Sequence, residues 1–395
     1  MNIRLLAVLA SMILLSACGK TIDRGTVSGY SDTPANIVVS IDGIDSVTDF
    51  GDLKLPLPAE KLLSSGYSYS DMLEVTILGN HFDIPLISDF SLLEAGRAAM
   101  VAQKGSNAQI GILIGLFASK CGIADYSVSG KSELVWKPKE GVKFPLDVTI
   151  SLKEPKGYKD VYDVLVHSRT DRFVPGAQTE EQFCNFRDIG GAFSSGGGIA
   201  EGIVYRGASP LDNNYGRRDL CDKMMAKYGI RSVVNLADTF EKAVTYEKYA
   251  SSVYSGLNVA YCKFTNLEAD IARPVLAEAI RHIISSEPPY YVHCQEGKDR
   301  TGVFAALLEG FMGADGQEIL DDDMLTFINY FGIKEGTKVY DIMSSHIFTM
   351  LSMLACQEVS VSSDIPAVCN AILRSLGLTE EELKALRLRL SGKEE

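Results

Sequence analysis

The chain has 395 residues, 46% of them hydrophobic, which is enough for a sizeable core and favours two domains. Its formal net charge of −13 excludes a general positive field for nucleic acid, so an anionic ligand would need a local positive site.

The first 18 residues predict a targeting segment that is not part of the fold. Arg4 precedes an apolar run, residues 5–15, that is too short to cross a bilayer as a permanent helix. The sequence Leu15-Ser16-Ala17-Cys18 resembles a bacterial lipobox, which implies lipid attachment at Cys18. We therefore expect an exported protein, on the cell surface or the periplasmic side, that is anchored to a membrane by lipid. The alternative is an ordinary signal peptide that contains a cysteine.

Residues 19–35 are rich in Gly, Ser, Thr and Asp and predict a flexible tether. Residues 36–160 predict a β-rich N-terminal domain, because strand-like segments are separated by turn residues. The clearest signal is Gly79-Asn80 between two apolar segments, which predicts a hairpin. This region contains no recognisable catalytic constellation. We therefore interpret it as a module that packs on the enzyme or positions it.

Residues 161–183 are polar, contain Pro175-Gly176 and predict a linker. Residues 184–395 predict an α/β domain with a central sheet flanked by helices. Its predicted strands are residues 231–236, 257–262 and 290–292, and its predicted helices are residues 276–285 and 301–312.

The strongest chemical signal is His293-Cys294-Gln295-Glu296-Gly297-Lys298-Asp299-Arg300-Thr301-Gly302, placed between a predicted strand and a predicted helix. Five residues between Cys294 and Arg300 can form one tight loop whose backbone N–H groups surround an anion. Gly297 gives the freedom for the curl, and Arg300 can hold two phosphate oxygens at once. The following helix adds its positive N-terminal dipole. In that field we expect Cys294 to be a thiolate near neutral pH.

This loop resembles the signature of the protein tyrosine phosphatase superfamily, Cys-x5-Arg followed by Ser or Thr. Its longer form is similar to the bacterial and fungal branch of tyrosine and dual-specificity phosphatases. Three further segments resemble motifs of that branch in the same order, so that the resemblance covers about residues 184–390. They are Asn185-Phe186-Arg187-Asp188-Ile189-Gly190-Gly191, Val204-Tyr205-Arg206-Gly207-Ala208-Ser209 and Asp322-Asp323-Met324-Leu325-Thr326.

The predicted chemistry is nucleophilic attack by Cys294 on phosphorus, which forms a phosphocysteine that water then hydrolyses. Arg300 and the backbone N–H groups of residues 295–300 would hold the phosphate oxygens, so that Gln295, Glu296, Gly297 and Lys298 belong to the predicted binding loop. His293 would orient the loop and favour the thiolate. Thr301 would donate its hydroxyl to the sulfur or serve only as a helix cap.

A carboxyl group must also protonate the leaving oxygen. The resemblance implies Asp299, beside the arginine, and Asp270 is the next candidate, on a predicted loop before the nucleophile. Asp238 and Glu268 rank behind these two. The structural alternative for Asp299 is an ion pair with Lys298 or Arg206.

Lys298 either favours polyanionic substrates, such as phosphoinositides or inositol phosphates, or faces solvent and only raises the local potential. The chain has Asn235-Leu236-Ala237-Asp238 where the branch usually has Asp-Leu-Arg, so the resemblance does not carry over substrate preference. We expect no cofactor, because no metal-ligand pattern is present and thiolate phosphatases need none.

The favoured function is a protein tyrosine phosphatase, with dual specificity as an extension of it. The alternatives are an inositol polyphosphate or phosphoinositide phosphatase, and a surface lipoprotein that binds anions with little turnover. Expected partners are a phosphorylated substrate and a membrane through the lipid anchor, and no nucleic acid.

Overall fold

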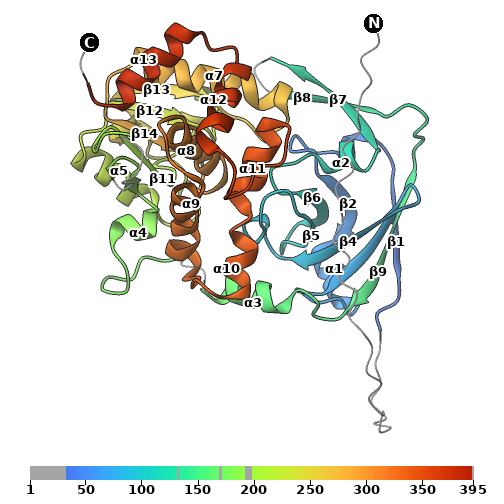
Figure 1. The fold of residues 1–395 in the computed structure, drawn as a ribbon. Helices are drawn as coiled ribbons and strands as arrows, with labels where there is room; N and C mark the ends of the chain where they lie inside the picture. Colours follow the sequence, from blue (N-terminus) through green and yellow to red (C-terminus); the bar gives the residue numbers. More distant parts are fainter. Residues whose placement is uncertain (1–32, 131–132, 169–170, 192–197, 394–395) are drawn as a thin grey trace, which may run out of the picture. The chain divides into compact units, whose positions relative to one another are not determined.

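Two β-sheets organise the part of the chain that the structure describes (Figure 1). The structure is a computed structural model, and it describes residues 33–130, 133–168, 171–191 and 198–393. Cys18, the targeting segment and most of the predicted tether lie outside these ranges. Among the described residues, no helix combines the length and the apolar character that crossing a membrane requires.

The N-terminal part, residues 34–168, is built on a mainly antiparallel seven-stranded sheet whose edge strands β1 and β2 also contact each other. In β2 (Leu53–Pro58), the leucines are buried and the residues between them are exposed, which is the period of two of a strand that covers a core. The sheet order is β1 (Ile37–Ile41), β9 (Leu146–Glu154), β3 (Met72–Ile77), β4 (Asn80–Ile87), β5 (Ala98–Val101), β6 (Asn107–Ile112) and β2. A separate hairpin joins β7 (Ala124–Ser129) and β8 (Glu133–Pro138). Two short helices, α1 (Ala59–Ser64) and α2 (Phe117–Lys120), complete this part before α3 (Lys159–Ser168).

The predicted hairpin at Gly79-Asn80 is confirmed, because β3 and β4 pair antiparallel from Met72–Pro85 to Ile77–Asn80. The β-rich character of this part is confirmed as well.

The C-terminal part, residues 171–393, contains a sheet of five short strands. Four neighbouring strands of this sheet are parallel to one another. Its order is β10 (Arg187–Asp188), β11 (Val204–Gly207), β14 (Tyr290–His293), β12 (Ser232–Asn235) and β13 (Asn258–Tyr261). Strands β11, β12 and β14 are buried along their whole length, as expected where elements cover both faces of a parallel sheet. Gly207 and Asn235 both pair with His293, so three strands end in one line. The predicted α/β class is confirmed.

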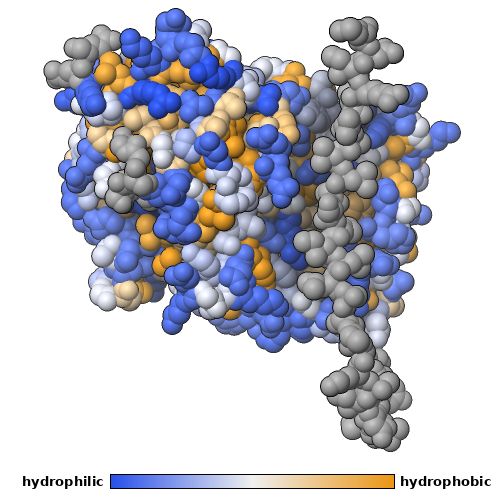
Figure 2. Space-filling view, in the orientation of Figure 1, coloured by the Kyte–Doolittle hydropathy of each residue, from blue (hydrophilic) through white to orange (hydrophobic). Residues whose placement is uncertain are grey.

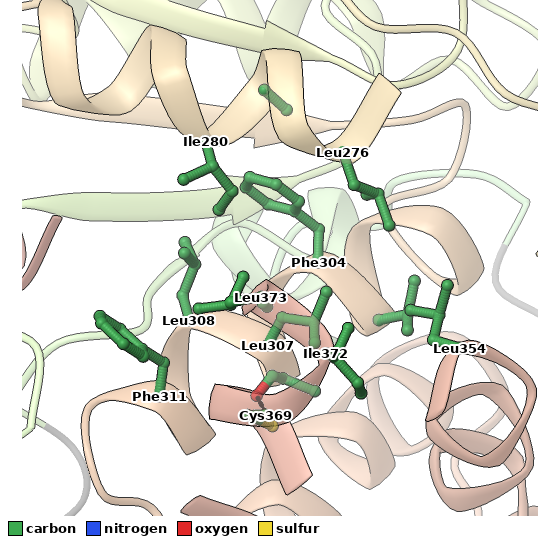
Figure 3. Close-up of a cluster of buried hydrophobic side chains, with 14 of the residues drawn as sticks. Leu276, Ile280, Phe304, Leu307, Leu308, Phe311, Leu354, Cys369, Ile372 and Leu373 are labelled. Atoms are coloured by element: carbon green, nitrogen blue, oxygen red, sulfur yellow. Dashed lines mark hydrogen bonds between the residues drawn. The ribbon is translucent and has the colours of Figure 1, made fainter. Parts of the chain in front are cut away.

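Helices surround this sheet and continue to the C-terminus (Figure 1). They are α4 (Glu180–Cys184), α5 (Arg218–Lys227), α6 (Phe240–Ala243), α7 (Ala269–Ser285), α8 (Asp299–Phe311), α9 (Gly316–Phe331), α10 (Lys338–Met343), α11 (His346–Ala355), α12 (Ile365–Ser375) and α13 (Glu380–Leu390). Helix α8 is the central one, and all its residues from Thr301 to Phe311 are buried. Figure 3 shows Phe304, Leu307 and Leu308 of α8 among side chains from α7, α11 and α12. This packing fixes the N-terminus of α8 against the end of β14.

Two predicted boundaries differ from the structure. Helix α7 begins at Ala269 and not at residue 276, although Pro274 lies inside it. A proline inside a helix removes one backbone hydrogen bond, but Ile271, Ala272 and Val275 are buried and hold the first turns in place. The segment predicted as a linker contains α4 and most of α3.

The N-terminal and C-terminal parts share one hydrophobic cluster, the shared core. It joins Ile87, Leu92, Leu93, Ala99 and Val101 to α3 and to Met324, Phe327, Tyr330 and Phe331 of α9. Residues Pro34–Glu395 accordingly form a single compact unit. On the face drawn in Figure 2, hydrophilic residues predominate and hydrophobic ones form small separate patches.

Candidate active site

The candidate site is the loop between β14 and α8, where His293 ends the strand and Asp299 begins the helix. Gly297 has a φ of +68°, and a Cβ atom at this position would overlap the backbone of Gly207. Only glycine fits both the conformation and the space. The loop therefore curls tightly against the end of β11.

The carbonyl groups of this loop are turned outward, because atoms outside the loop bind three of them in succession. The C=O of one residue and the N–H of the next point in opposite directions across a planar peptide. The N–H groups of residues 296–298 therefore face the inside of the loop, where an anion would lie. The bonds run from Ser209 N to Gln295 O (3.0 Å), from Tyr330 Oη to Glu296 O (2.5 Å) and from Arg206 Nη2 to Gly297 O (2.9 Å).

A buried ion-pair network supports the loop from behind. Arg206 is fully buried and forms an ion pair with Asp322, which also accepts a hydrogen bond from Arg187 Nε at 2.6 Å. Burial alone would raise the pKa of Asp322, but the two guanidinium groups outweigh it and lower that pKa. Asn185 Nδ2 completes the network with hydrogen bonds of 3.1 Å to Gly297 O and to Thr326 Oγ1. The three flanking motifs found in the sequence thus meet in one scaffold.

His293 lies under the loop as a neutral ring. It is fully buried, and burial lowers its pKa to about 4. Its Nδ1 lies 3.0 Å from the Cys294 carbonyl, which can only accept, so Nδ1 carries the proton. Nε2 then accepts from Tyr254 Oη at 3.4 Å. His293 therefore orients the Cys294 peptide by hydrogen bonding and contributes no positive charge near neutral pH.

Arg300 lies in the first turn of α8, and its Nη1 is fixed by the ends of two strands. Nη1 donates to Leu236 O at 3.0 Å and to Phe264 O at 3.2 Å. These two bonds fix the orientation of the guanidinium group, and Nε and Nη2 take no part in them. Thr301 is fully buried, and its hydroxyl has no hydrogen-bond partner among the described residues. That hydroxyl is therefore available at the helix N-terminus, next to the loop.

A cavity of about 380 Å³ lies over the loop, and its walls come from both parts of the chain. The loop contributes Cys294, Gln295, Glu296, Asp299 and Arg300. The remaining C-terminal wall is Asp212, Asn214, Tyr215, Arg217 and Thr265. The N-terminal wall is Phe50, Asp52, Asp89, Phe90, Ser91, Gln109, Ile112, Leu113, Ile114 and Gly115. The predicted nucleophile and the predicted phosphate-binding arginine thus line the same cavity.

A sequence model described as "Tyrosine phosphatase family" matches residues 179–392, more than half of the chain and all of the loop and its scaffold. The chain belongs to the tyrosine phosphatase family. No curated protein matches it.

Three solved structures similar to this family member have low identity and low TM-scores. The core catalytic domain of the PP-IP phosphatase SIW14 from S. cerevisiae, in complex with citrate, is 14% identical with a TM-score of 0.26. The match covers 37% of this chain and 91% of that one. A P. aeruginosa TpbA variant in complex with pTyr is 19% identical, with coverages of 37% and 86% and a TM-score of 0.23. An uncharacterized conserved protein from Thermotoga maritima is 14% identical with a TM-score of 0.22, and this match covers 29% of this chain and only 36% of that one.

In this phosphatase, Lys298 does not face solvent, so that alternative is wrong. Its side chain is fully buried, and Nζ donates to Ser91 O of the N-terminal part at 3.0 Å. Nζ also pairs with Asp299 at 3.4 Å and lies 5.5 Å from the centre of the Phe327 ring. Through these contacts, the ammonium group joins the loop to the N-terminal part. Lys298 is not among the residues that line the cavity.

Asp299 lines the cavity but is held as a carboxylate. Burial would raise its pKa, yet Lys298 and His346 outweigh this effect and hold that pKa well below its ordinary value of 3.8. His346 Nε2 lies 3.1 Å from Asp299 Oδ1, while Nδ1 accepts from Ala95 N at 2.9 Å. The ion pair with Lys298 that was weighed as an alternative is present. An ionised carboxylate is poorly suited to donate a proton.

The other predicted carboxyl groups lie outside the residues that line the cavity. Asp270 accepts from Tyr126 Oη of the β7–β8 hairpin at 2.9 Å. Asp238 is buried and accepts from Tyr246 Oη at 3.1 Å. Glu268 precedes α7 as its N-cap residue.

Sequence reasoning did not find the N-terminal wall, with Asp52, or the His346 that supports Asp299. These residues are far from the loop in sequence and belong to no motif. In the sequence, Asp52 resembles an ordinary aspartate of a turn, and His346 resembles an ordinary helix residue. Only the tertiary fold brings them to the loop.

Proposed function

We propose that this protein is a cysteine-dependent phosphatase that hydrolyses phosphomonoesters, with phosphotyrosine in proteins as the preferred substrate. The observation that carries the proposal is the inward-facing set of N–H groups beside Cys294 and Arg300 in one cavity. Such donors stabilise negative charge on the three non-bridging oxygens as the reaction proceeds.

In the proposed mechanism, the Cys294 thiolate attacks phosphorus as the bond to the leaving oxygen breaks, and that oxygen takes up a proton. The phosphoryl group is then bound to sulfur while Arg300 and the loop N–H groups hold its oxygens. A water molecule attacks phosphorus, the P–S bond breaks and the thiolate is restored with release of inorganic phosphate. The Thr301 hydroxyl supports the leaving sulfur as a hydrogen-bond donor in this second step.

The lining of the cavity supports an aromatic ester with a single phosphate. Phe50, Phe90 and Tyr215 provide aromatic surface for a phenyl ring. The titratable lining consists of five carboxyl groups and two guanidinium groups, so further phosphates on the substrate would meet acidic walls. The carboxyl groups are those of Asp52, Asp89, Asp212, Glu296 and Asp299, and the guanidinium groups are those of Arg217 and Arg300. This charge balance argues against inositol polyphosphates and phosphoinositides.

The test is phosphate release by the protein lacking residues 1–18, with a Cys294→Ser variant and a Cys356→Ser control. Cys356 is an exposed free cysteine, so its replacement controls for the loss of a thiol. The substrates are a phosphotyrosine peptide, a phosphoserine peptide, a phosphoinositide and inositol hexakisphosphate. We expect the highest turnover on phosphotyrosine, lost in Cys294→Ser and kept in Cys356→Ser. Activity that survives Cys294→Ser, or preference for inositol hexakisphosphate, would contradict the proposal, and no turnover at all would favour the anion-binding alternative.

We also propose that the protein is exported and anchored to a membrane through a lipid on Cys18. The support is the short positive start, the apolar run and the small residues before Cys18. In a bacterial host, a Cys18→Ala variant should lose incorporation of labelled fatty acid. Equal labelling of both proteins would reject the anchor.

A further inference from the structure

The N-terminal part supplies one wall of the cavity that holds the phosphate loop. In phosphoryl transfer, the attacking and leaving atoms lie roughly in line with phosphorus. With Cys294 on the loop side, the leaving oxygen therefore departs toward the other side of the cavity. Two carboxyl groups of the N-terminal wall line the same cavity as Cys294, those of Asp52 and Asp89.

Asp52 is held in this wall by its backbone. Its backbone is held by Thr48, which donates from its N–H to Asp52 O at 2.9 Å and accepts from Asp52 N through Oγ1 at 3.2 Å. The carboxyl group lies directly over the backbone of Gly111, where any Cβ atom would overlap Oδ1, and the Phe90 ring lies at the same point. Asp52 is 7% exposed. Its backbone, just before β2, is therefore held in place, and its side chain is largely shielded from solvent.

The Asp52 carboxyl group is protonated near neutral pH. Burial raises its pKa to about 8, so that it is a neutral acid at pH 7. Asp89 accepts from Ser91 N at 2.7 Å, and Asp212 accepts from Asn214 N at 2.9 Å. Asp299 is ion-paired with Lys298 and lies 3.1 Å from His346 Nε2. The charged groups that line the cavity with Asp52 are Asp89, Asp212, Glu296, Asp299, Arg217 and Arg300.

We propose that Asp52 is the proton donor of the reaction, supplied to the catalytic loop by the β-rich N-terminal part. This inference rests on the proposed function. As the S–P bond forms and the P–O bond breaks, the Asp52 carboxylic acid gives its proton to the ester oxygen, which leaves as a phenol. The Asp52 carboxylate then accepts a proton from the water that attacks the phosphocysteine, and the P–S bond breaks to restore the thiolate. The proton count is thus restored after each turnover.

The test compares wild type and Asp52→Asn on aryl phosphates graded by the acidity of the leaving phenol. A weakly acidic phenol, such as tyrosine, needs the proton, and we expect kcat to fall by about 10²–10⁴-fold in the variant. A strongly acidic phenol, such as a dinitrophenol, leaves as the anion and should lose little. A uniform loss over the series would indicate a structural role for Asp52, and no loss would exclude it as the donor.

The matched control is Asp71→Asn, because Asp71 is a buried aspartate of the same N-terminal part that does not line the cavity. It should keep the wild-type dependence on the leaving group. The Cys294→Ser variant separates the two proposals, because loss of the cysteine should abolish release from every ester whether or not Asp52 is the donor.

If the Asp52→Asn variant does not fold, the pH profile of the wild-type protein provides a second test. With phosphotyrosine, kcat should fall above about pH 8 as Asp52 ionises. With a dinitrophenyl ester, this alkaline fall should be absent. An identical profile for both esters would overturn the proposal.

Discussion

Asp299 shows how single charges near the loop are balanced. Its carboxylate is ion-paired with Lys298 and lies 3.1 Å from His346 Nε2, and its pKa lies below the ordinary value of 3.8. A carboxyl group whose pKa is lowered on folding stabilises the fold above its unfolded pKa, and this contribution is lost as pH falls through the folded pKa. Asp299→Asn should therefore lower the free energy of unfolding at pH 7 by about 1–3 kcal/mol. Urea denaturation at pH 7 and at about pH 2, well below the unfolded pKa of 3.8, measures this. A difference that does not shrink at the lower pH would contradict the ion-pair interpretation.

The pKa of Asp52 is shifted in the opposite direction to that of Asp299. Its pKa is raised from 3.8 to about 8, so the folded protein binds a proton that the unfolded chain releases between these values. Stability then falls as pH rises through this window. Asp52→Asn mimics the neutral acid and should raise the free energy of unfolding at pH 7 by on the order of 2 kcal/mol. Melting temperatures at pH 7 and pH 4 should show the gain at pH 7 and little difference at pH 4. Equal stability at pH 7 would mean that Asp52 ionises freely.

The sequence identified the loop because its residues are consecutive, so that Cys294, Gly297 and Arg300 define their own geometry. The flanking motifs were found by resemblance, but their role was not, because an ion pair such as Arg206–Asp322 joins residues 116 positions apart. The burial of Lys298 depends on Ser91, which is 207 positions away. Charge and spacing in the sequence predict the chemistry of a residue, whereas the tertiary fold determines which residues surround it.

Helix α8 couples the loop to the core at the level of elements. Gly310 lies where α12 approaches, and a Cβ atom there would be 2.5 Å from Cys369 Sγ and 2.8 Å from Ile365 Cγ2. Gly310→Ala gains helix propensity, but the helices must separate to admit the methyl group. We expect a net loss of about 1–3 kcal/mol in the free energy of unfolding, measured by urea denaturation. The double variant Gly310→Ala with Cys369→Ala should recover part of it. A stabilised single variant would show that α12 adapts easily.

Predicted elements were most accurate where one pattern dominates. The sequence placed β12, β13 and β14 within one residue at each end, because short apolar segments lie between turn residues. It misplaced the start of α7, which begins at Ala269 and not at residue 276, and it treated most of α3 as a linker. In α3, Val161, Tyr162 and Leu165 are buried against the shared core. Whether such short helices form depends on their contacts with another part of the chain.

At the scale of the whole molecule, the shared core predicts that the N-terminal and C-terminal parts unfold together. Separation would expose Met324, Phe327 and Phe331 of α9, each worth about 1.5–3 kcal/mol when fully buried. Trp136 is the only tryptophan and lies in the N-terminal part on β8, against Tyr126, whereas most helices lie in the C-terminal part. Tryptophan fluorescence and the far-UV circular dichroism of helices therefore report on different parts. Their urea transitions should coincide within error.

Two separate midpoints would show that the N-terminal part folds as an independent domain. That result would also weaken the inference on Asp52, because its carboxyl group is held near the loop only while the two parts stay joined. A Lys298→Met variant sharpens the comparison, since it removes the hydrogen bond to Ser91 O and leaves a side chain of similar length. If the link matters, this variant should shift both transitions to lower urea concentration together, and the activity on phosphotyrosine should fall with them. A shift in the fluorescence transition alone would mean that the two parts are coupled too weakly to share a catalytic cavity.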